Sequence, residues 1–138
     1  MPPAESRPCG RAGSGSPPRP AAASGCWTDD YCLGMLTFKG KDNLLDINAW
    51  KKSPDPVVRQ NPKANVYAPG HNSFFRSPDG REDWILYHAN SKPGQGCGSQ
   101  RSPRAQRFKW NNDGTPVFGV PVEVGEEILL PANKKTTP

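Results

Sequence analysis

Two histidines are the first residues of this chain that could do chemistry. His71 follows Pro69-Gly70 in the segment YAPGHNSFFRSPDGREDWILYHAN, residues 67–90, and His88 stands near the end of that segment. From the residues alone, His71 is typical of a histidine that stabilises a turn or is buried and hydrogen-bonded. An isolated imidazole is also a poor calcium site, because calcium prefers oxygen ligands. The histidines by themselves therefore identify no reaction.

The thirteen acidic residues contain no recognisable pair of general acid and general base. Asp46 and Asp55 lie in a segment broken by prolines, Asp83 directly precedes Trp84, and Glu123 is near the chain end. Turns and loops, where carboxylates stay solvated, are expected to hold Asp29, Asp30, Asp42, Asp79, Glu82, Asp113, Glu126 and Glu127. No Gly-x-Ser-x-Gly motif or phosphate-binding loop indicates another chemistry. The sequence predicts no catalytic residue in this chain.

The four cysteines, Cys9, Cys26, Cys32 and Cys97, do not match a zinc site. Structural zinc takes cysteine pairs two to four residues apart, and the nearest pair here is Cys26 and Cys32. A disulfide between these two is favoured if the protein is secreted. In a cytosolic protein the same residues would be buried or free thiols. The spacing leaves the pairing of all four open.

The net charge of +5 raises the question of a nucleic-acid partner. The strongest basic cluster is RSPRAQRFK at residues 101–109, in which Arg101, Arg104 and Arg107 recur every third residue. A strand presents alternate residues on one face, so it would not align these three cations. No nucleic-acid-binding motif accompanies them, and solvated surface is the favoured interpretation. We expect no nucleic-acid partner.

Both ends of the chain are expected to be disordered. Residues 1–25 are rich in Pro, Gly, Ser and Ala and hold no large apolar side chain, so they cannot offset the entropy lost on ordering. Residues 131–138 are expected to form a disordered C-terminus. Residues 1–25 also lack the apolar core of a signal peptide, and no stretch approaches the ~20 apolar residues of a membrane span. We therefore expect no membrane partner.

The region between the tails reads as short strands. Residues 31–38, YCLGMLTF, predict a strand, whereas Pro54 and Pro56 limit residues 44–58 to a short edge strand. Four further strands joined by tight turns are expected at HNSFFRS, DWILYHAN, RAQRFKW and VFGVPVEV. In DWILYHAN, alternation places Trp84, Leu86 and His88 on one face.

A four-stranded meander with two apolar faces must be covered on both sides. The β-propeller stacks such meanders side by side, at roughly 40–50 residues per blade. Residues 26–130 therefore predict an all-β partial propeller of one to two blades, with the last blade at about 67–125.

Four segments together resemble the C-terminal part of glycoside hydrolase family 43, the group of arabinofuranosidases, arabinanases and xylosidases. They are CWTDDYCLGMLT, WKKSPDPVVRQNP, YAPGHNSFFRSPDGREDWILYHAN and CGSQRSPRAQRFKWNNDGTPVFGVPV. The resemblance runs from about residue 25 to 130. It implies a five-bladed β-propeller, of which this chain would supply the last one or two blades. It also implies an extracellular enzyme that hydrolyses polysaccharides or oligosaccharides containing arabinose or xylose.

The same resemblance implies roles for individual residues. His71 would face the central channel as the one protein ligand of a calcium ion, with water completing the shell. Arg104 would project toward the substrate pocket, where Asn72 of the Gly-His-Asn-Ser run would also contact substrate, whereas His88 is expected to be structural. The alternative for Arg104 is a solvated strand residue.

The resemblance also implies an inverting reaction, which needs an acid and a base on separate carboxylates. In the family these carboxylates, and a third that tunes the acid, lie on earlier blades. This chain is therefore expected to be inactive alone. The alternative is a non-catalytic carbohydrate-binding or structural remnant, in which Trp27, Trp50, Trp84 and Trp110 could offer aromatic platforms. For Trp84 and Trp110, core packing between blades is the favoured interpretation.

Overall fold

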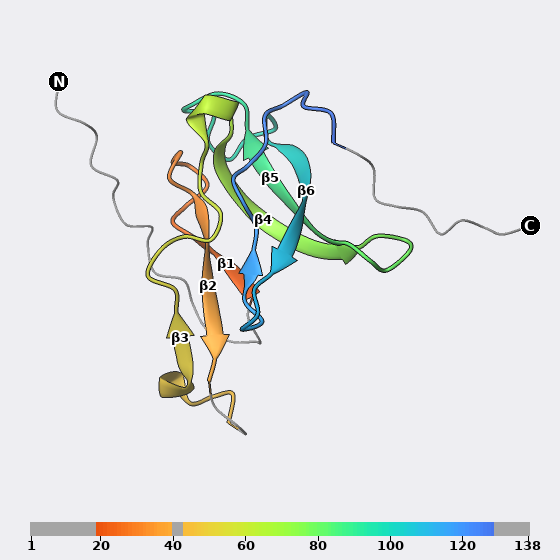
Figure 1. Cartoon of the computed structure of the whole chain (residues 1–138). Helices are drawn as coiled ribbons and strands as arrows, with labels where there is room; N and C mark the ends of the chain where they lie inside the picture. Colours follow the sequence, from red (N-terminus) through yellow and green to blue (C-terminus); the bar gives the residue numbers. More distant parts are fainter. Residues whose placement is uncertain (1–18, 40–42, 129–138) are drawn as a thin grey trace, which may run out of the picture.

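The computed structural model describes residues 19–39 and 43–128, which form two antiparallel sheets (Figure 1). Their orders are β1-β2-β3 and β4-β5-β6-β7. The strands are β1 (Arg19–Ala23), β2 (Cys32–Phe38), β3 (Trp50–Lys52), β4 (Tyr67–Arg76), β5 (Asp83–Asn90), β6 (Ser102–Trp110) and β7 (Pro116–Val117). Two short 3-10 helices lie in the connections, η1 (Ile47–Ala49) and η2 (Pro62–Ala64). The all-β prediction is confirmed. Within the described residues, no helix is long and apolar enough to cross a membrane.

The three-stranded sheet is built on the apolar run that begins at Cys32. β2 pairs with β1 over Ala23↔Cys32 to Arg19↔Leu36, and with β3 over Leu36↔Lys52 to Phe38↔Trp50. The rings of Phe38 and Trp50 lie 5.1 Å apart across this pairing. β3 ends at Lys52, two residues before Pro54. Proline has no N–H with which to continue the ladder. The short edge strand predicted within residues 44–58 is confirmed.

The four-stranded sheet is the expected meander. β4 and β5 form a hairpin whose register closes at Arg76↔Asp83. In its turn, Gly80 adopts a φ of 75°, and its N–H donates to the carbonyl of Ser77 over 2.8 Å. β5 pairs with β6 from Asp83↔Phe108 to Ala89↔Ser102, and β6 pairs with β7 only at its last two residues.

The core lies between the two sheets. On β5, Ile85, Tyr87 and Ala89 alternate along one face and are at most 1% exposed. They belong to one buried apolar cluster with Leu33 of β2 and with Val58. The chain after Pro56 is tied to β2, since Leu33 N–H donates to the Val58 carbonyl over 2.9 Å. The cluster is completed by Ala64, Val66, Phe108 and Phe118.

Tyr87 and Gln106 bring polar groups into this core. The Tyr87 hydroxyl donates to Gln106 Oε1 over 3.0 Å, and Gln106 Nε2 donates to the carbonyl of Phe118 over 2.7 Å. Burial raises the pKa of Tyr87 to about 12, although the nearby Arg104 charge opposes the shift. The bridge joins β5 and β6 to the segment after β7.

Two strand predictions differ from the structure. Residues 19–23, expected in the disordered tail, form β1 on the edge of β2. The prediction weighed side-chain burial, whereas a strand can join a sheet edge through its main chain alone. VFGVPVEV was expected to form a full strand, but β7 ends at Val117 because Gly119 has a φ of 75° and Pro121 has no N–H. Residues 1–18 and 131–138 lie outside the described residues.

The cysteines also pair differently from the favoured Cys26–Cys32 link. Cys26 is bonded to Cys97, with an S–S distance of 2.05 Å, and Cys32 is itself disulfide-bonded. Sequence distance misled the prediction, because the fold brings the loop after β5 next to the loop before β2. No cysteine is therefore available as a free thiol or a metal ligand in the described residues.

Replacing both Cys26 and Cys97 by serine should lower the free energy of unfolding by about 2–5 kcal/mol. The disulfide closes a loop of sequence separation 71, and the loss reflects the entropy that the unfolded chain regains. Urea unfolding of the 138-residue chain measures it. Ser99→Ala, in the same exposed loop, is the control. Equal stability of the double variant and the parent would show that this disulfide constrains nothing.

Alkaline pH should destabilise the fold through Tyr87. The folded pKa of about 12 lies above the ordinary value of 10.0, so the unfolded state loses its proton first. Stability is then complete below pH 10 and falls as pH rises toward 12, by up to about 1.4 kcal/mol per pH unit. Denaturant titrations across this window should show the slope in the parent chain. Tyr87→Phe, which keeps every disulfide, should flatten it; an unchanged slope would assign the effect to another group.

Candidate functional site

The backbone of β4 departs from regular strand geometry next to His71. Ala68 and His71 both have positive φ angles, of 51° and 55°, which side chains with a Cβ seldom adopt. The register with β5 shifts on either side of Gly70. Such bulges redirect side chains, and strain of this kind concentrates at functional sites. The segment Ala68–His71 is therefore the first candidate for a site.

A cavity of about 350 Å³ lies beside this segment. Its lining contains His71, His88 and Arg101, with Tyr31 and the Cys26–Cys97 disulfide. The two imidazole rings are 5.5 Å apart. Gly70 is essential to the shape, because a Cβ at this position would overlap the ring of Tyr31. The fold thus gathers both histidines at one place, although only His71 was predicted to serve a site.

Arg101 is the residue of this cavity that the sequence did not single out. Its Nη2 donates to the carbonyls of Ala68 and His88, over 2.9 and 3.0 Å, and its guanidinium lies 5.4 Å from the centre of the Tyr31 ring. It therefore ties β4 to β5. Burial lowers its pKa, an effect that Tyr31 opposes. The only signal in the sequence was the basic cluster, which was assigned to solvated surface.

Arg104 lies elsewhere, on the core side of β6. Its Nη2 donates to Ser91 Oγ over 2.9 Å and its Nε to Ser102 Oγ over 3.3 Å. Burial lowers its pKa, with Tyr87 acting in the opposite direction. Its Nη1 is buried and has no hydrogen-bond partner among the described residues. Arg104 does not line the His71 cavity, so the structure does not bring these two predicted site residues together there.

Asn72, the third predicted site residue, is half-buried on β4 directly after His71. It does not line the His71 cavity either. The predicted substrate-binding pair, Arg104 and Asn72, therefore stays a prediction.

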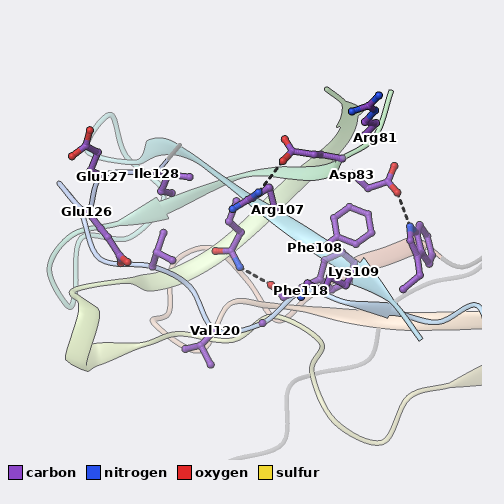
Figure 2. A pocket seen from close by; sticks show the side chains of 15 residues that line it. Arg81, Asp83, Arg107, Phe108, Lys109, Phe118, Val120, Glu126, Glu127 and Ile128 are labelled. Atoms are coloured by element: carbon purple, nitrogen blue, oxygen red, sulfur yellow. Dashed lines mark hydrogen bonds and ion pairs between the residues drawn. The ribbon is translucent and has the colours of Figure 1, made fainter. Parts of the chain in front are cut away.

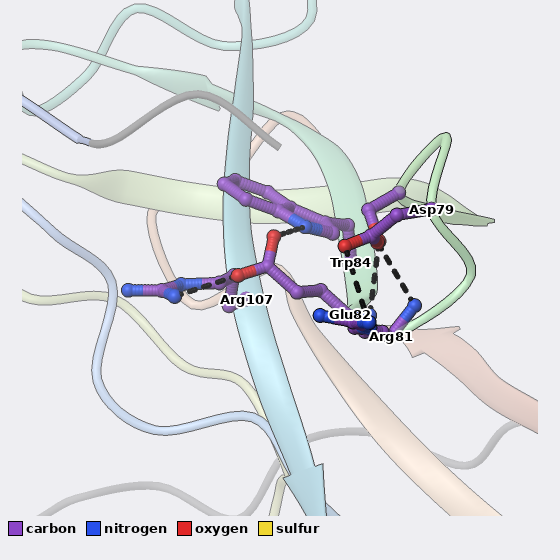
Figure 3. Close-up of polar contacts among 6 residues, drawn as sticks. Asp79, Arg81, Glu82, Trp84 and Arg107 are labelled. Atoms are coloured by element: carbon purple, nitrogen blue, oxygen red, sulfur yellow. Dashed lines mark hydrogen bonds and ion pairs between the residues drawn. The ribbon is translucent and has the colours of Figure 1, made fainter. Parts of the chain in front are cut away.

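The three clustered arginines go to three different environments, as their spacing indicated. Arg101 enters the histidine cavity, and Arg104 is half-buried on the core side of β6. Arg107 is exposed on the opposite face, where its Nη1 lies 2.8 Å from Glu82 Oε1. Figure 3 shows this ion pair and the bond from Trp84 Nε1 to Glu82 Oε2, which is 3.2 Å long. The cations form no stripe that could follow a phosphate backbone.

A second and larger hollow, of about 850 Å³, lies beside β6 and the segment after β7 (Figure 2). We call it the β6 groove. Its wall includes Trp110, Phe108 and Phe118, and its rim carries basic side chains from β6, acidic ones from the segment after β7, and charged side chains of both signs from residues 81–83. Trp110 is 50% exposed, whereas Trp84 is only 3% exposed. Trp84 is thus packed within this chain, whereas the expected packing of Trp110 between blades stays a prediction.

Two of the described carboxyl groups, Asp79 and Asp113, do not suit the role of a general acid. Such a group needs a raised pKa. The pKa of Asp79 is lowered, chiefly by the hydroxyl of Ser77, and the pKa of Asp113 is lowered, chiefly by the hydroxyl of Thr115. Neither group could hold a proton for a leaving group near neutral pH.

Comparison with known proteins decides the family. Residues 20–116 match the family described as Glycosyl hydrolases family 43. The chain belongs to this family. An extracellular exo-α-(1→5)-L-arabinofuranosidase of Streptomyces avermitilis is 43% identical over 100 residues, which are 70% of this chain and 21% of that protein. α-L-Arabinofuranosidase 43 of Humicola insolens is 38% identical over 102 residues, again 70% and 21% of the two chains.

Solved structures of family 43 confirm the fold class. The crystal structure of an α-L-arabinofuranosidase from Lactobacillus brevis aligns with a TM-score of 0.69 and 36% identity, over 78% of this chain and 34% of that one. The structure of a thermostable family-43 glycoside hydrolase aligns with a TM-score of 0.67 and 24% identity. The two sheets are therefore blades of a family 43 propeller. The chain spans about a fifth of the length of the curated relatives.

The calcium ion that family 43 membership implies does not suit the surroundings of His71. The cavity offers two imidazoles, a guanidinium, a phenol and a disulfide, and no carboxylate lines it. Calcium takes six to eight oxygen ligands and would be repelled by the arginine. No group of three or more His, Cys, Asp or Glu side chains among the described residues could hold a metal. Calcium binding stays a prediction that these residues do not favour.

Millimolar calcium should therefore leave the melting temperature of the 138-residue chain unchanged, because an ion stabilises only the state that binds it. Differential scanning fluorimetry with and without a chelator measures this. His71→Ala is the matched variant and should respond in the same way as the parent. A calcium-dependent rise that is present in the parent and lost in His71→Ala would establish the ion site.

Proposed function

We propose that this chain is part of a glycoside hydrolase that cleaves the O-glycosyl bonds of arabinose-containing plant polysaccharides. The observation that carries the proposal is its 43% identity over 100 residues to a protein named an exo-α-(1→5)-L-arabinofuranosidase. Two more proteins named as α-L-arabinofuranosidases, from Humicola insolens and Pyricularia oryzae, match at 38% and 37% identity. We favour arabinosides over xylosides for this reason.

Within that enzyme, this chain contributes scaffold and substrate contacts and no acid or base. Asp79 and Asp113 do not fit the role of the acid, because their pKa values are lowered and an inverting glycosidase needs one carboxyl group with a raised pKa. The 138-residue chain alone is therefore expected to be inactive.

Arg104 is the proposed substrate-side residue, with Asn72 as a second contact. Its guanidinium is oriented by two serine hydroxyls, while Nη1 keeps a buried donor without a partner among the described residues. Buried donors are nearly always satisfied in complete proteins. A sugar hydroxyl, or a group that positions the sugar, would accept the hydrogen bond that Arg104 Nη1 lacks.

The working compartment is proposed to be extracellular. The Cys26–Cys97 disulfide supports this, because such bonds persist in oxidising environments. The Streptomyces avermitilis relative is also named as extracellular.

A chimera tests the proposed activity. Residues 20–128 would replace the matching segment of the Streptomyces avermitilis enzyme, and hydrolysis of aryl α-L-arabinofuranoside and aryl β-D-xyloside would be followed. We expect the chimera to hydrolyse the arabinofuranoside with the higher kcat/KM, and the 138-residue chain alone to hydrolyse neither. A folded chimera that prefers the xyloside, or a 138-residue chain that turns over substrate, would refute the corresponding part of the proposal.

In the same chimera, Arg104→Ala should lower kcat/KM by about a hundredfold or more, as the loss of a buried charged contact to substrate commonly does. Arg59→Ala is the control. Arg59 is 58% exposed, and its Nη2 lies 4.0 Å from Asp55 Oδ1, which is the long limit of an ion pair. Loss of this weak surface pair should leave kcat/KM within about twofold of the parent. If both variants kept full activity, Arg104 would be a structural residue only.

A further inference from the structure

We propose that the β6 groove is a second, non-catalytic binding site for a neutral chain of the substrate polysaccharide, with Trp110 as its aromatic platform. The inference rests on the proposed function for the kind of sugar, but the argument for a sugar comes from the groove itself. Its volume of about 850 Å³ is within the range of pockets that hold ligands of several rings.

Trp110 is held in a fixed orientation while half of its surface stays exposed. Its Nε1 donates to Asp83 Oδ2 over 2.7 Å, and its ring meets Phe108 edge-on with the centroids 5.2 Å apart. Asp83 is itself fixed by Arg76, whose Nε lies 3.1 Å from Oδ1. An exposed indole costs solvation free energy, and here the ring is also immobilised. A rigid ring with a free surface is a ready platform for the apolar face of a sugar.

The floor of the groove continues from this ring as an apolar strip. Phe108 and Phe118 have ring centroids 4.9 Å apart and are both nearly buried. Val120, which is 69% exposed, lies beyond them on the segment after β7. Figure 2 shows Phe108, Phe118 and Val120 along the same hollow. Phe108 and Phe118 are nearly buried, so they support the Trp110 ring rather than contact a ligand, and Val120 adds a second exposed apolar side chain to the groove.

The charges around the groove largely satisfy one another. Three basic side chains, Arg81, Arg107 and Lys109, face four acidic ones, Glu82, Asp83, Glu126 and Glu127. Arg107 is paired with Glu82 over 2.8 Å, and Arg76 with Asp83 over 3.1 Å. A balanced rim produces no strong field that would attract a phosphate, a uronate chain or a nucleic acid. It still offers many donors and acceptors to uncharged hydroxyl groups.

These features separate the β6 groove from the histidine cavity. The cavity is less than half as large, is lined by a guanidinium and two imidazoles, and shares no residue with the groove. Arg104 does not line the groove either. The groove therefore has its own chemistry, suited to holding a polysaccharide chain near the enzyme rather than to cleaving it.

The test follows the indole N–H signals of the 138-residue chain by ¹⁵N NMR during titration with arabinopentaose. The four tryptophans report separately. We expect a saturable shift of the Trp110 signal, with an affinity that changes little between low and high salt, because no ion pair forms on binding. Oligogalacturonate of similar length should bind at least about tenfold more weakly, since it would bring uncompensated negative charge to the rim.

Trp110→Ala should weaken arabinopentaose binding at least about tenfold, and Trp110→Phe, which keeps an aromatic ring, should weaken it less. Trp27→Ala is the control, because Trp27 is 75% exposed and lies outside the groove. Circular dichroism of each variant checks the fold, and Trp110→Phe carries the test if the alanine variant unfolds.

Absence of a saturable Trp110 shift, equal loss of binding in Trp27→Ala, or stronger binding of the acidic oligosaccharide would each overturn the proposal. Binding of xylopentaose without arabinopentaose would overturn arabinan as the ligand. None of these results bears on hydrolysis by the chimera, so the proposed activity and this second site can fail independently. A chimera that cleaves only xylosides would likewise leave the measured groove affinity unchanged.

Discussion

Leu33 and Val58 on one side, and Ile85, Tyr87 and Ala89 on the other, form the apolar contact that holds the two sheets together. Each sheet alone would leave this face in water, at a cost of roughly 25 cal/mol per Å² of apolar surface. The contact also fixes the direction of β5. One end of β5 delivers His88 to the histidine cavity, and the other delivers Asp83 to the β6 groove.

Polar groups carry this constraint outward from the core. Tyr87 reaches Gln106, and Gln106 reaches the carbonyl of Phe118, so the segment after β7 is anchored by a side chain where a strand ladder has ended. At the opposite end, Arg101 binds two carbonyls and fixes the bulged part of β4 to β5. In the histidine cavity and in the β6 groove alike, one wall is held by strand pairing. The other wall is held by one side chain, which is Arg101 in the cavity and Gln106 in the groove.

Local patterns in the sequence predict most of the fold. Alternation in DWILYHAN and the Pro-Asp-Gly and Asn-Asp-Gly turns indicate β5, β6 and their hairpins, because period and turn chemistry act over a few residues. Features that depend on distant segments were not predictable in this way. The partner of Cys26 is 71 residues away, and β1 is held to β2 through its main chain.

The candidate site also combines features that local sequence predicts with features that depend on distant segments. The resemblance drew attention to His71, and the spacing of the three arginines correctly indicated that they diverge. Arg101 was missed because nothing near it in sequence shows that two carbonyls from β4 and β5 converge on it. Trp110 was expected to pack between blades, and within the described residues its position at the end of β6 leaves it half exposed.

The brevity of β7 has a further consequence. It pairs with Lys109 and Trp110 only, so in the described structure the earlier part of β6 has β5 on one edge and no strand on the other. An open strand edge is a template on which an extended peptide can add, and such additions lead to aggregation. The charged side chain of Arg107 on this part of β6, together with the glutamates that line the groove, opposes that outcome. The same charges that leave the β6 groove open to an uncharged polysaccharide thus disfavour the addition of a peptide strand.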